Sequence, residues 1–221
     1  MANAPLIGVY GGTFNPIHAG HLRAAEEVMA QLELDRMIFV PSARPPHKNA
    51  ETGDPIAPAD ERFAWAQAAV EADPRCEVDP IEVERGGKSY LVDTLRTLGE
   101  RLAPSELVFV LGADAFREMD AWREPGSLFT LAHFAVTSRP PLRRGSLPEW
   151  IPEGLAAAFE MAEDGLSARH VAAATWIRLL EIDAIDVSAS SIRERIRTGA
   201  SVRYLLPEAI HDAVVGSRHY A

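Results

Sequence analysis

The sequence is almost without cysteine, since Cys76 is the only one among its 221 residues. An internal disulfide and a zinc site built on several thiolates are therefore excluded. The chain also has no basic segment followed by a long apolar one at its start, and no apolar run approaches the roughly 20 residues of a membrane span. We expect a cytoplasmic protein that does not associate with membranes.

Positive charge is scarce as well: 22 lysine and arginine residues stand against 32 aspartate and glutamate residues, for a formal net charge of −10. A surface this acidic repels nucleic acid unless basic residues are concentrated locally, so a DNA- or RNA-binding module is disfavoured. The length suits one α/β domain with a substantial core, and we expect residues 1–221 to form a single domain.

Short apolar runs alternate with segments in which apolar residues recur at helical spacing. The runs predict strands at Leu6–Tyr10, Arg36–Ser42, Cys76–Val83, Glu106–Ala115, His133–Pro140 and Ile177–Val187. The helical spacing predicts helices at His18–Leu32, Asp60–Ala72 and Leu91–Leu102, and a helical C-terminal segment over about 188–221. This alternation predicts an α/β fold: a Rossmann-like, doubly wound, mainly parallel sheet with helices on both faces and a C-terminal helical extension.

Two stretches do not follow this alternation. Residues Ala43–Pro58 form a long proline-rich loop, and a loop of this length in a compact domain is usually functional or disordered. Residues Pro141–Ala174 are irregular, with one helix predicted near Leu155–Met161.

Four candidate features follow predicted strands directly. They are Gly11-Gly12, the proline-rich loop, Gly112–Asp114 and Ser188–Arg193. Ligands of open α/β sheets bind beyond the carboxyl ends of the strands. The shared location predicts one ligand site at that edge of the sheet.

The stretch "GGTFNPIHAGHL" (11–22) has the chemistry of a phosphate site. Gly11 and Gly12 allow close approach of the backbone to a ligand, and Pro16 suits a helix start. His18 and His21 share one face of the first helical turn, where exposed N–H donors favour anions. Metal binding by the two histidines is the rival interpretation, although no carboxylate lies at ligand spacing in this turn.

The common nucleotide-binding fingerprints are missing. The stretch "GVYGGT" lacks G-x-G-x-x-G, and G-x-x-x-x-G-K-[ST] occurs nowhere in the chain. Ordinary nicotinamide-dependent oxidoreductases and P-loop enzymes are therefore disfavoured.

Instead, "GGTFNPIHAGHL" resembles the signature of the nucleotidylyltransferase superfamily, whose H-x-G-H element binds nucleotide phosphates. Further elements follow in the order seen in bacterial nicotinate-nucleotide adenylyltransferases: "PPHK" (45–48), "SYLVDTL" (89–95), "LGAD" (111–114), "SRP" (138–140), "VSASSIR" (187–193) and "YLLPEAIHDAV" (204–214). The resemblance spans nearly the whole chain and is weakest over residues 141–174.

Three positions depart from the family pattern. Asn15 stands where an aspartate is common but keeps a polar acceptor, and Ala189 breaks the usual serine pair before Ser190. Leu91 stands where the family often has a threonine near the nicotinate base. A donor to the base would then come from the backbone or from a neighbour such as Ser89.

The resemblance implies that the phosphate of nicotinate mononucleotide attacks the α-phosphorus of ATP, giving nicotinate adenine dinucleotide and pyrophosphate. The nucleophile is already an anion, so catalysis consists of positioning and charge stabilisation. Mg²⁺ is expected as the counter-ion of ATP, held by phosphates and water rather than by a protein cage.

The resemblance also implies roles for individual residues. Those expected to contact ATP are Gly11, Gly12, Thr13, Phe14, His18, His21, Gly112, Asp114, Ser190 and Arg193. Those expected at the second substrate are His47, Lys48, Ser89, Leu91, Trp122, Arg123 and Arg139. The residues expected to act in catalysis are His18, His21, Lys48 and Arg193.

Several of these residues also have structural interpretations. Ser191 and Glu194 fit a capping box, and Asp114 fits a cap of the helix that follows it. Trp122 fits a core position, and Lys48 and Arg139 fit solvated charges. Arg193 and Arg197 are four residues apart, a like-charge pair that favours an anion between them, and we interpret it as a clamp for the β- and γ-phosphates of ATP.

Other functions stay open on the sequence alone. The same fold serves other nucleotidylyltransferases, such as one acting on phosphopantetheine, although "SYLVDTL" and "GADAFREMDAW" fit a nicotinate pocket better. A nucleotide sensor without catalysis would carry similar motifs. An RNA-acting relative is disfavoured by the acidic balance, and the oligomeric state, a homo-oligomer included, is open.

Overall fold

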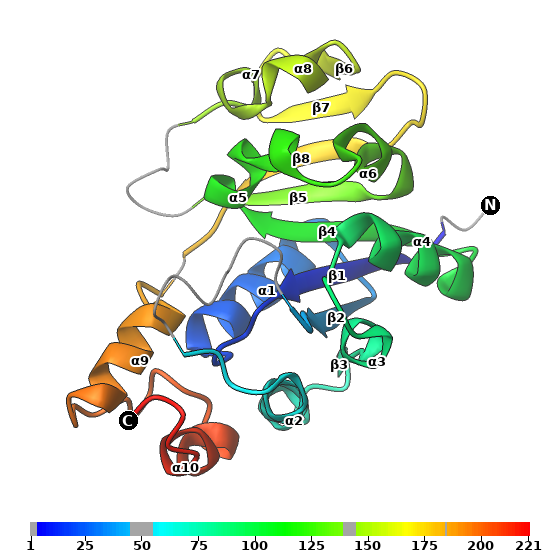
Figure 1. Cartoon of the computed structure of the whole chain (residues 1–221). Helices are drawn as coiled ribbons and strands as arrows, with labels where there is room; N and C mark the ends of the chain where they lie inside the picture. The colour runs from blue at the N-terminus through cyan, green and yellow to red at the C-terminus, as the bar shows by residue number, and fades with distance from the viewer. Residues whose placement is uncertain (1–3, 45–54, 139–144, 184) are drawn as a thin grey trace.

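The computed structural model describes residues 4–44, 55–138, 145–183 and 185–221, and it is built on one eight-stranded sheet. The strands are β1 (Leu6–Gly12), β2 (Arg36–Pro41), β3 (Cys76–Val78), β4 (Glu106–Gly112), β5 (His133–Ser138), β6 (Phe159–Met161), β7 (Ser167–His170) and β8 (Trp176–Glu181). The sheet order is β3-β2-β1-β4-β5-β8-β7-β6 (Figure 1).

The helices connect these strands. They are α1 (Ala19–Leu32), α2 (Ala59–Val70), α3 (Ile81–Arg85), α4 (Leu91–Leu102), α5 (Ala113–Arg117), the short 3₁₀ helix η2 (Met119–Ala121), α6 (Pro125–Leu131), α7 (Leu147–Trp150), α8 (Glu153–Ala156), α9 (Ala189–Arg197) and α10 (Glu208–Gly216). Among the residues that the structure describes, no helix combines the length and apolarity needed to cross a bilayer.

The central strands are parallel. β3, β2, β1, β4, β5 and β8 pair in parallel, whereas β7 pairs antiparallel with both β8 and β6. The chain runs outward from β1 through β2 to β3 and then returns to place β4 on the other side of β1. The predicted mainly parallel, doubly wound fold is confirmed, and its strand order reverses at the carboxyl ends of β1 and β4.

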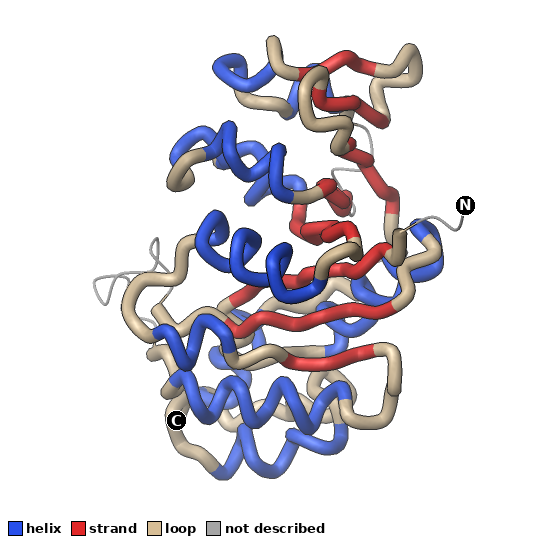
Figure 2. The backbone as a smooth tube through the Cα atoms, turned by 90° about the vertical axis from the view of Figure 1, so that its right-hand side faces the viewer, coloured by secondary structure: helices blue, strands red, loops and turns tan. Residues whose placement is uncertain are grey.

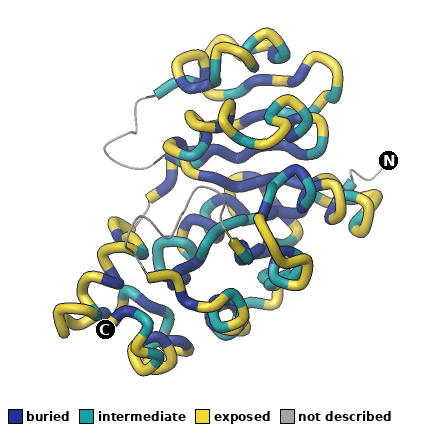
Figure 3. Tube along the Cα trace, viewed as in Figure 1, coloured by how far each residue is buried: buried dark blue, intermediate teal, exposed yellow. Residues whose placement is uncertain are grey.

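Two apolar layers cover the sheet because successive side chains of a strand point to opposite faces. Leu107, Phe109 and Leu111 of β4 pack with α4 and α6 on one face. Val108 and Val110 pack with α1, α2, α9 and α10 on the other. The buried strands lie between partly exposed helices (Figures 2 and 3).

The predicted strand Cys76–Val83 is wrong beyond Val78. The Asp79 side chain accepts a hydrogen bond from the backbone N–H of Ile81 at 2.9 Å, and α3 begins there. Such a local aspartate turn offers the backbone an alternative to the sheet ladder.

The predicted helix near Leu155–Met161 is also mostly wrong. α8 ends at Ala156, and Phe159–Met161 forms β6, which pairs with β7. β6 and β7 form a local antiparallel hairpin of strands only three and four residues long, which are too short to show a clear alternation of apolar and polar residues. The predicted strand Glu106–Ala115 is too long by three residues, because β4 ends at Gly112 and α5 begins at Ala113.

One buried arginine joins the loops at the carboxyl end of the sheet. Arg62 of α2 is 1% exposed. Its guanidinium donates to the carbonyls of Thr13 (2.5 Å), Ser42 (2.7 Å), Ala43 (3.1 Å) and Ala57 (2.9 Å). Burial lowers its pKa from the usual value, yet a guanidinium stays protonated. Arg62 therefore ties the turn after β1 to the loop after β2.

We predict that Arg62→Met lowers the free energy of unfolding by about 3–5 kcal/mol, because it leaves four buried or partly buried carbonyls without their charged donor. Urea unfolding of the purified variant measures this change.

The matched control is Arg36→Met. Arg36 pairs with Glu77 at 3.0 Å, but both side chains are largely solvated. This control should cost under about 1 kcal/mol. Equal losses in the two variants would contradict the role given to Arg62.

Candidate active site

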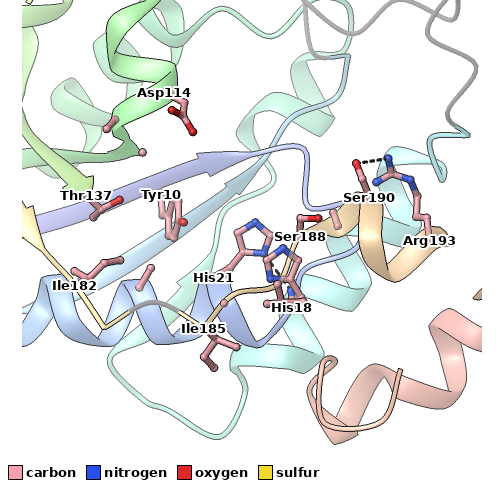
Figure 4. A pocket seen from close by; sticks show the side chains of 16 residues that line it. Tyr10, His18, His21, Asp114, Thr137, Ile182, Ile185, Ser188, Ser190 and Arg193 are labelled. Atoms are coloured by element: carbon pink, nitrogen blue, oxygen red, sulfur yellow. Dashed lines mark hydrogen bonds between the residues drawn. The ribbon is translucent and has the colours of Figure 1, made fainter. Parts of the chain in front are cut away.

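Two pockets flank the carboxyl end of β1. One, which we call the histidine pocket, has a volume of about 340 Å³ and is lined from β1, the start of α1, the β4–α5 junction and the start of α9 (Figure 4). The other, which we call the tryptophan pocket, has a volume of about 580 Å³ and is lined from residues 11–13, α4, β4 and residues 115–123. The predicted edge of the sheet therefore offers two neighbouring spaces.

The two histidines of the H-x-G-H element meet at the histidine pocket. His18 caps α1, His21 lies in its first turn, and their rings stack with centroids 3.7 Å apart. The backbone N–H of His18 donates to Nδ1 of His21 at 3.2 Å. A neutral His21 ring then carries its proton on Nε2, which makes that atom a donor. Phe14, 2% exposed, supports His21 edge-on at 5.1 Å and is not among the residues that line either pocket.

The glycine between the histidines has a steric reason. A Cβ at Gly20 would lie 2.9 Å from Cγ1 of Val187 and 3.1 Å from Nδ1 of His18. Both contacts are shorter than ordinary packing, so glycine lets the segment before α9 close against the start of α1.

Gly11 and Gly12, the last residues of β1, line the tryptophan pocket together with Thr13 and are not among the residues that line the histidine pocket. A Cβ at Gly12 would lie 2.9 Å from the ring of Phe14, and one at Gly11 would lie 3.2 Å from the ring of Phe109. Their small size therefore also serves packing.

The start of α9 is capped differently from the prediction. Ser188 is the capping residue: its Oγ accepts from the N–H of Ser191 at 3.1 Å, and Oγ of Ser191 accepts from the N–H of Ser188 at 3.3 Å. The capping box expected for Ser191 and Glu194 is wrong. Glu194 instead binds Arg197 at 2.6 Å on the solvent side.

Arg193 and Arg197 do not form the expected double clamp. Arg197 is exposed and paired with Glu194, whereas Arg193 is 7% exposed. Arg193 donates to the backbone carbonyl of Asn15 at 2.9 Å and to Oγ of Ser190 at 3.0 Å. Among the described residues, Arg193 is thus the one buried guanidinium that lines the histidine pocket, and Ser190 lines it beside Arg193.

Gly112 and Asp114 also line the histidine pocket, and Figure 4 shows Asp114 on the side away from Ser190 and Arg193. A Cβ at Gly112 would meet no atom within 4 Å, so packing does not require a glycine there. Gly112 caps α5 without any side-chain cap bond, so the alternative that Asp114 caps this helix does not hold. The carboxylate of Asp114 therefore lies at the pocket without capping the helix.

Aromatic rings form much of the tryptophan pocket. Trp122 packs edge-on against Phe109 with centroids 6.5 Å apart, so its predicted pocket and core roles coincide. The guanidinium of Arg123 lies 4.7 Å from the ring centre of Tyr90 and 3.5 Å from a carboxylate oxygen of Asp93. An apolar ring with an anionic substituent fits these neighbours.

Glu82 is a buried carboxylate at this pocket that was not predicted from the sequence. Glu82 accepts from Oγ1 of Thr94 at 2.6 Å and from the hydroxyl of Ser89, and burial raises its pKa from the usual value. The Ser89 hydroxyl accepts in turn from the N–H of Ala43 at 3.0 Å. The Ser89 hydroxyl is thus hydrogen-bonded to two groups of the protein, although Ser89 lines the pocket with Leu91.

Three expected residues, His47, Lys48 and Arg139, lie outside the described residues. Tyr10 and Thr137 line the histidine pocket although the sequence did not single them out. Each lies towards the carboxyl end of a predicted strand, which is the signal that could have found them.

Comparison with known proteins agrees with this geometry. The profile of the cytidylyltransferase-like family matches residues 9–195. A "probable nicotinate-nucleotide adenylyltransferase" of Geotalea uraniireducens is 36% identical over 217 residues, covering 97% of each chain. A protein of the same name from Leifsonia xyli is 37% identical over 216 residues, covering 98% of this chain and 93% of the relative.

The fold agrees as well. The nicotinic acid mononucleotide adenylyltransferase of Plasmodium falciparum, solved in complex with NaAD, superposes with a TM-score of 0.71 at 15% identity, covering 98% of this chain and 97% of the other. At that identity the likeness concerns the fold. The full-length relatives and the family profile together establish that this chain belongs to the cytidylyltransferase-like family and, within it, to the nicotinate-nucleotide adenylyltransferases.

Proposed function

We propose that this protein transfers the AMP moiety of ATP to nicotinate mononucleotide, forming nicotinate adenine dinucleotide and pyrophosphate in NAD biosynthesis. The observation that carries the proposal is the pair of unlike pockets on either side of the carboxyl end of β1. Full-length relatives bear the name of this activity.

ATP fits the histidine pocket. Nε2 of His21, the guanidinium of Arg193 and the N-terminus of α9 offer donors and positive charge to its phosphates. Gly112 and Asp114 stand on the far wall, where the ribose and adenine would lie. Thr13 lines the other pocket, so in this proposal it lies nearer the second substrate. Phe14 packs edge-on against His21 and so acts on ATP only by supporting that ring.

Nicotinate mononucleotide fits the tryptophan pocket. The rings of Trp122, Tyr90 and Phe109 suit a flat pyridine ring, and Arg123 suits its carboxylate. Its phosphate would point across residues 11–13 towards the histidines. His47, Lys48 and Arg139 remain proposed contacts of this phosphate or of the carboxylate.

In the proposed reaction a phosphate oxygen of the mononucleotide attacks the α-phosphorus of ATP, and the bond to the pyrophosphate oxygen breaks. The attacking oxygen is already ionised, so no general base is needed. His18 and His21 hold the α-phosphate and stabilise the charge that develops on its oxygens, while Arg193 holds the departing pyrophosphate.

Mg²⁺ would enter with ATP. Within the described part of the chain no group of three or more His, Cys, Asp or Glu side chains could hold an ion by itself, while Asp114 offers one carboxylate in the histidine pocket. Phosphate oxygens and water would hold the ion beside Asp114, and it would neutralise part of the triphosphate charge. The same proposal takes residues 1–221 as one domain working in the cytoplasm, where ATP is available.

We predict that, with ATP and Mg²⁺, pyrophosphate release shows a kcat/KM at least about 10-fold higher with nicotinate mononucleotide than with nicotinamide mononucleotide or phosphopantetheine, because only the first matches both Arg123 and the aromatic rings. A coupled pyrophosphate assay makes the comparison. Preference for phosphopantetheine would reject the acceptor assignment. Binding of ATP without turnover of any acceptor would favour a nucleotide sensor.

We also predict that His18→Ala and His21→Ala each lower kcat at least about 100-fold while leaving the thermal unfolding temperature nearly unchanged, because the rings face the pocket rather than the core. The matched control is His211→Ala on α10, which should retain full activity. Near-normal turnover in both pocket variants would overturn the assignment of the histidines.

A further inference from the structure

Tyr220 contacts the turn between β1 and α1. Tyr220, the penultimate residue, is 2% exposed and packs against Trp65 of α2 with ring centroids 6.3 Å apart. Its hydroxyl donates to Oδ1 of Asn15 at 2.5 Å. Asn15 lies in the turn between β1 and α1, three residues before His18. The side chain of Tyr220 therefore contacts the turn that leads to the two histidines.

Asn15 connects four segments. Its Oδ1 accepts from the N–H of Ala57 at 3.0 Å as well as from Tyr220, and its Nδ2 donates to the carbonyl of Pro55 at 2.9 Å. Its backbone carbonyl accepts from Arg193 at 2.9 Å. The amide orientation is fixed, because the N–H of Ala57 can only donate. Asn15 is thus one of the groups that hold the Arg193 guanidinium in place.

These two acceptors of Arg193, the carbonyl of Asn15 and the hydroxyl of Ser190, are neutral. They help to orient the guanidinium of Arg193, which lines the histidine pocket. Burial raises the pKa of Tyr220 above its usual value, against the opposing pull of Arg193 and Arg62. The phenol is therefore a protonated donor near neutral pH.

We propose that Tyr220 is a positioning residue: by holding Asn15, it places Arg193 and the turn before His18 for the phosphates of ATP. The inference rests on the proposed function in assigning ATP to the histidine pocket. The proposal predicts a change in kcat/KM for ATP rather than in KM for the mononucleotide. The reason is that the contacts of Tyr220 lead through Asn15 to Arg193 and not to Trp122 or Arg123.

The test is Tyr220→Phe, which keeps the ring in the core and removes only the hydroxyl. We expect kcat/KM for ATP to fall about 5- to 10-fold, mainly through KM, and KM for nicotinate mononucleotide to change less than about 2-fold. The matched control is Tyr204→Phe, the same chemical change at a side chain that is 84% exposed, and it should alter neither constant. A lower unfolding temperature with unchanged constants for ATP would overturn the proposal.

A double-mutant cycle tests the route through Asn15. If Tyr220 acts through this residue, adding Tyr220→Phe to Asn15→Ala should lower kcat/KM for ATP less than about 2-fold further. A full, additive loss in the double variant would overturn the route. Should wild-type protein fail to use nicotinate mononucleotide, the proposed function fails, but the affinity of the same variants for Mg²⁺–ATP by calorimetry still decides the role of Tyr220.

Discussion

The reversal of strand order at β1 is the constraint on which the site depends. Because β1 leads to β2 on one side and β4 leads to β5 on the other, the connections that leave the carboxyl ends of β1 and β4 diverge instead of covering one another. The diverging loops leave two spaces that share one wall, the turn of residues 11–18. A reaction that joins two phosphate-bearing molecules needs such a shared wall, since both reacting groups must reach the same point from opposite sides.

Besides the side chain of Asn15, two backbone carbonyls hold this turn. Arg62 binds the carbonyl of Thr13, and Arg193 binds that of Asn15. Both guanidinium groups are buried, so two positive charges lie in contact with a turn that lines both pockets. A chain with a net charge of −10 can in this way present an attractive surface to polyanions at one place.

Most of the fold could be predicted from the sequence, because buried parallel strands and amphipathic helices leave strong local patterns; the helix over Leu91–Leu102 begins and ends where predicted. The pairing of β6 with β7 could not, since strands of three and four residues are too short to leave a clear alternating pattern. At the site, the motif placed His18 and His21 correctly on one face. It could not show that Arg193 turns inwards while Arg197 turns outwards, or that Glu82 engages Ser89, because those contacts are decided by packing.

The two borders of the sheet also have a consequence. Its outermost strands, β3 and β6, are each only three residues long. An exposed border of this length presents few unpaired amide and carbonyl groups to a foreign strand, so lateral addition and amyloid-like stacking gain little there. A largely parallel sheet folds slowly because its strands come from distant segments. Short edge strands reduce the chance that partly folded chains pair with it and aggregate.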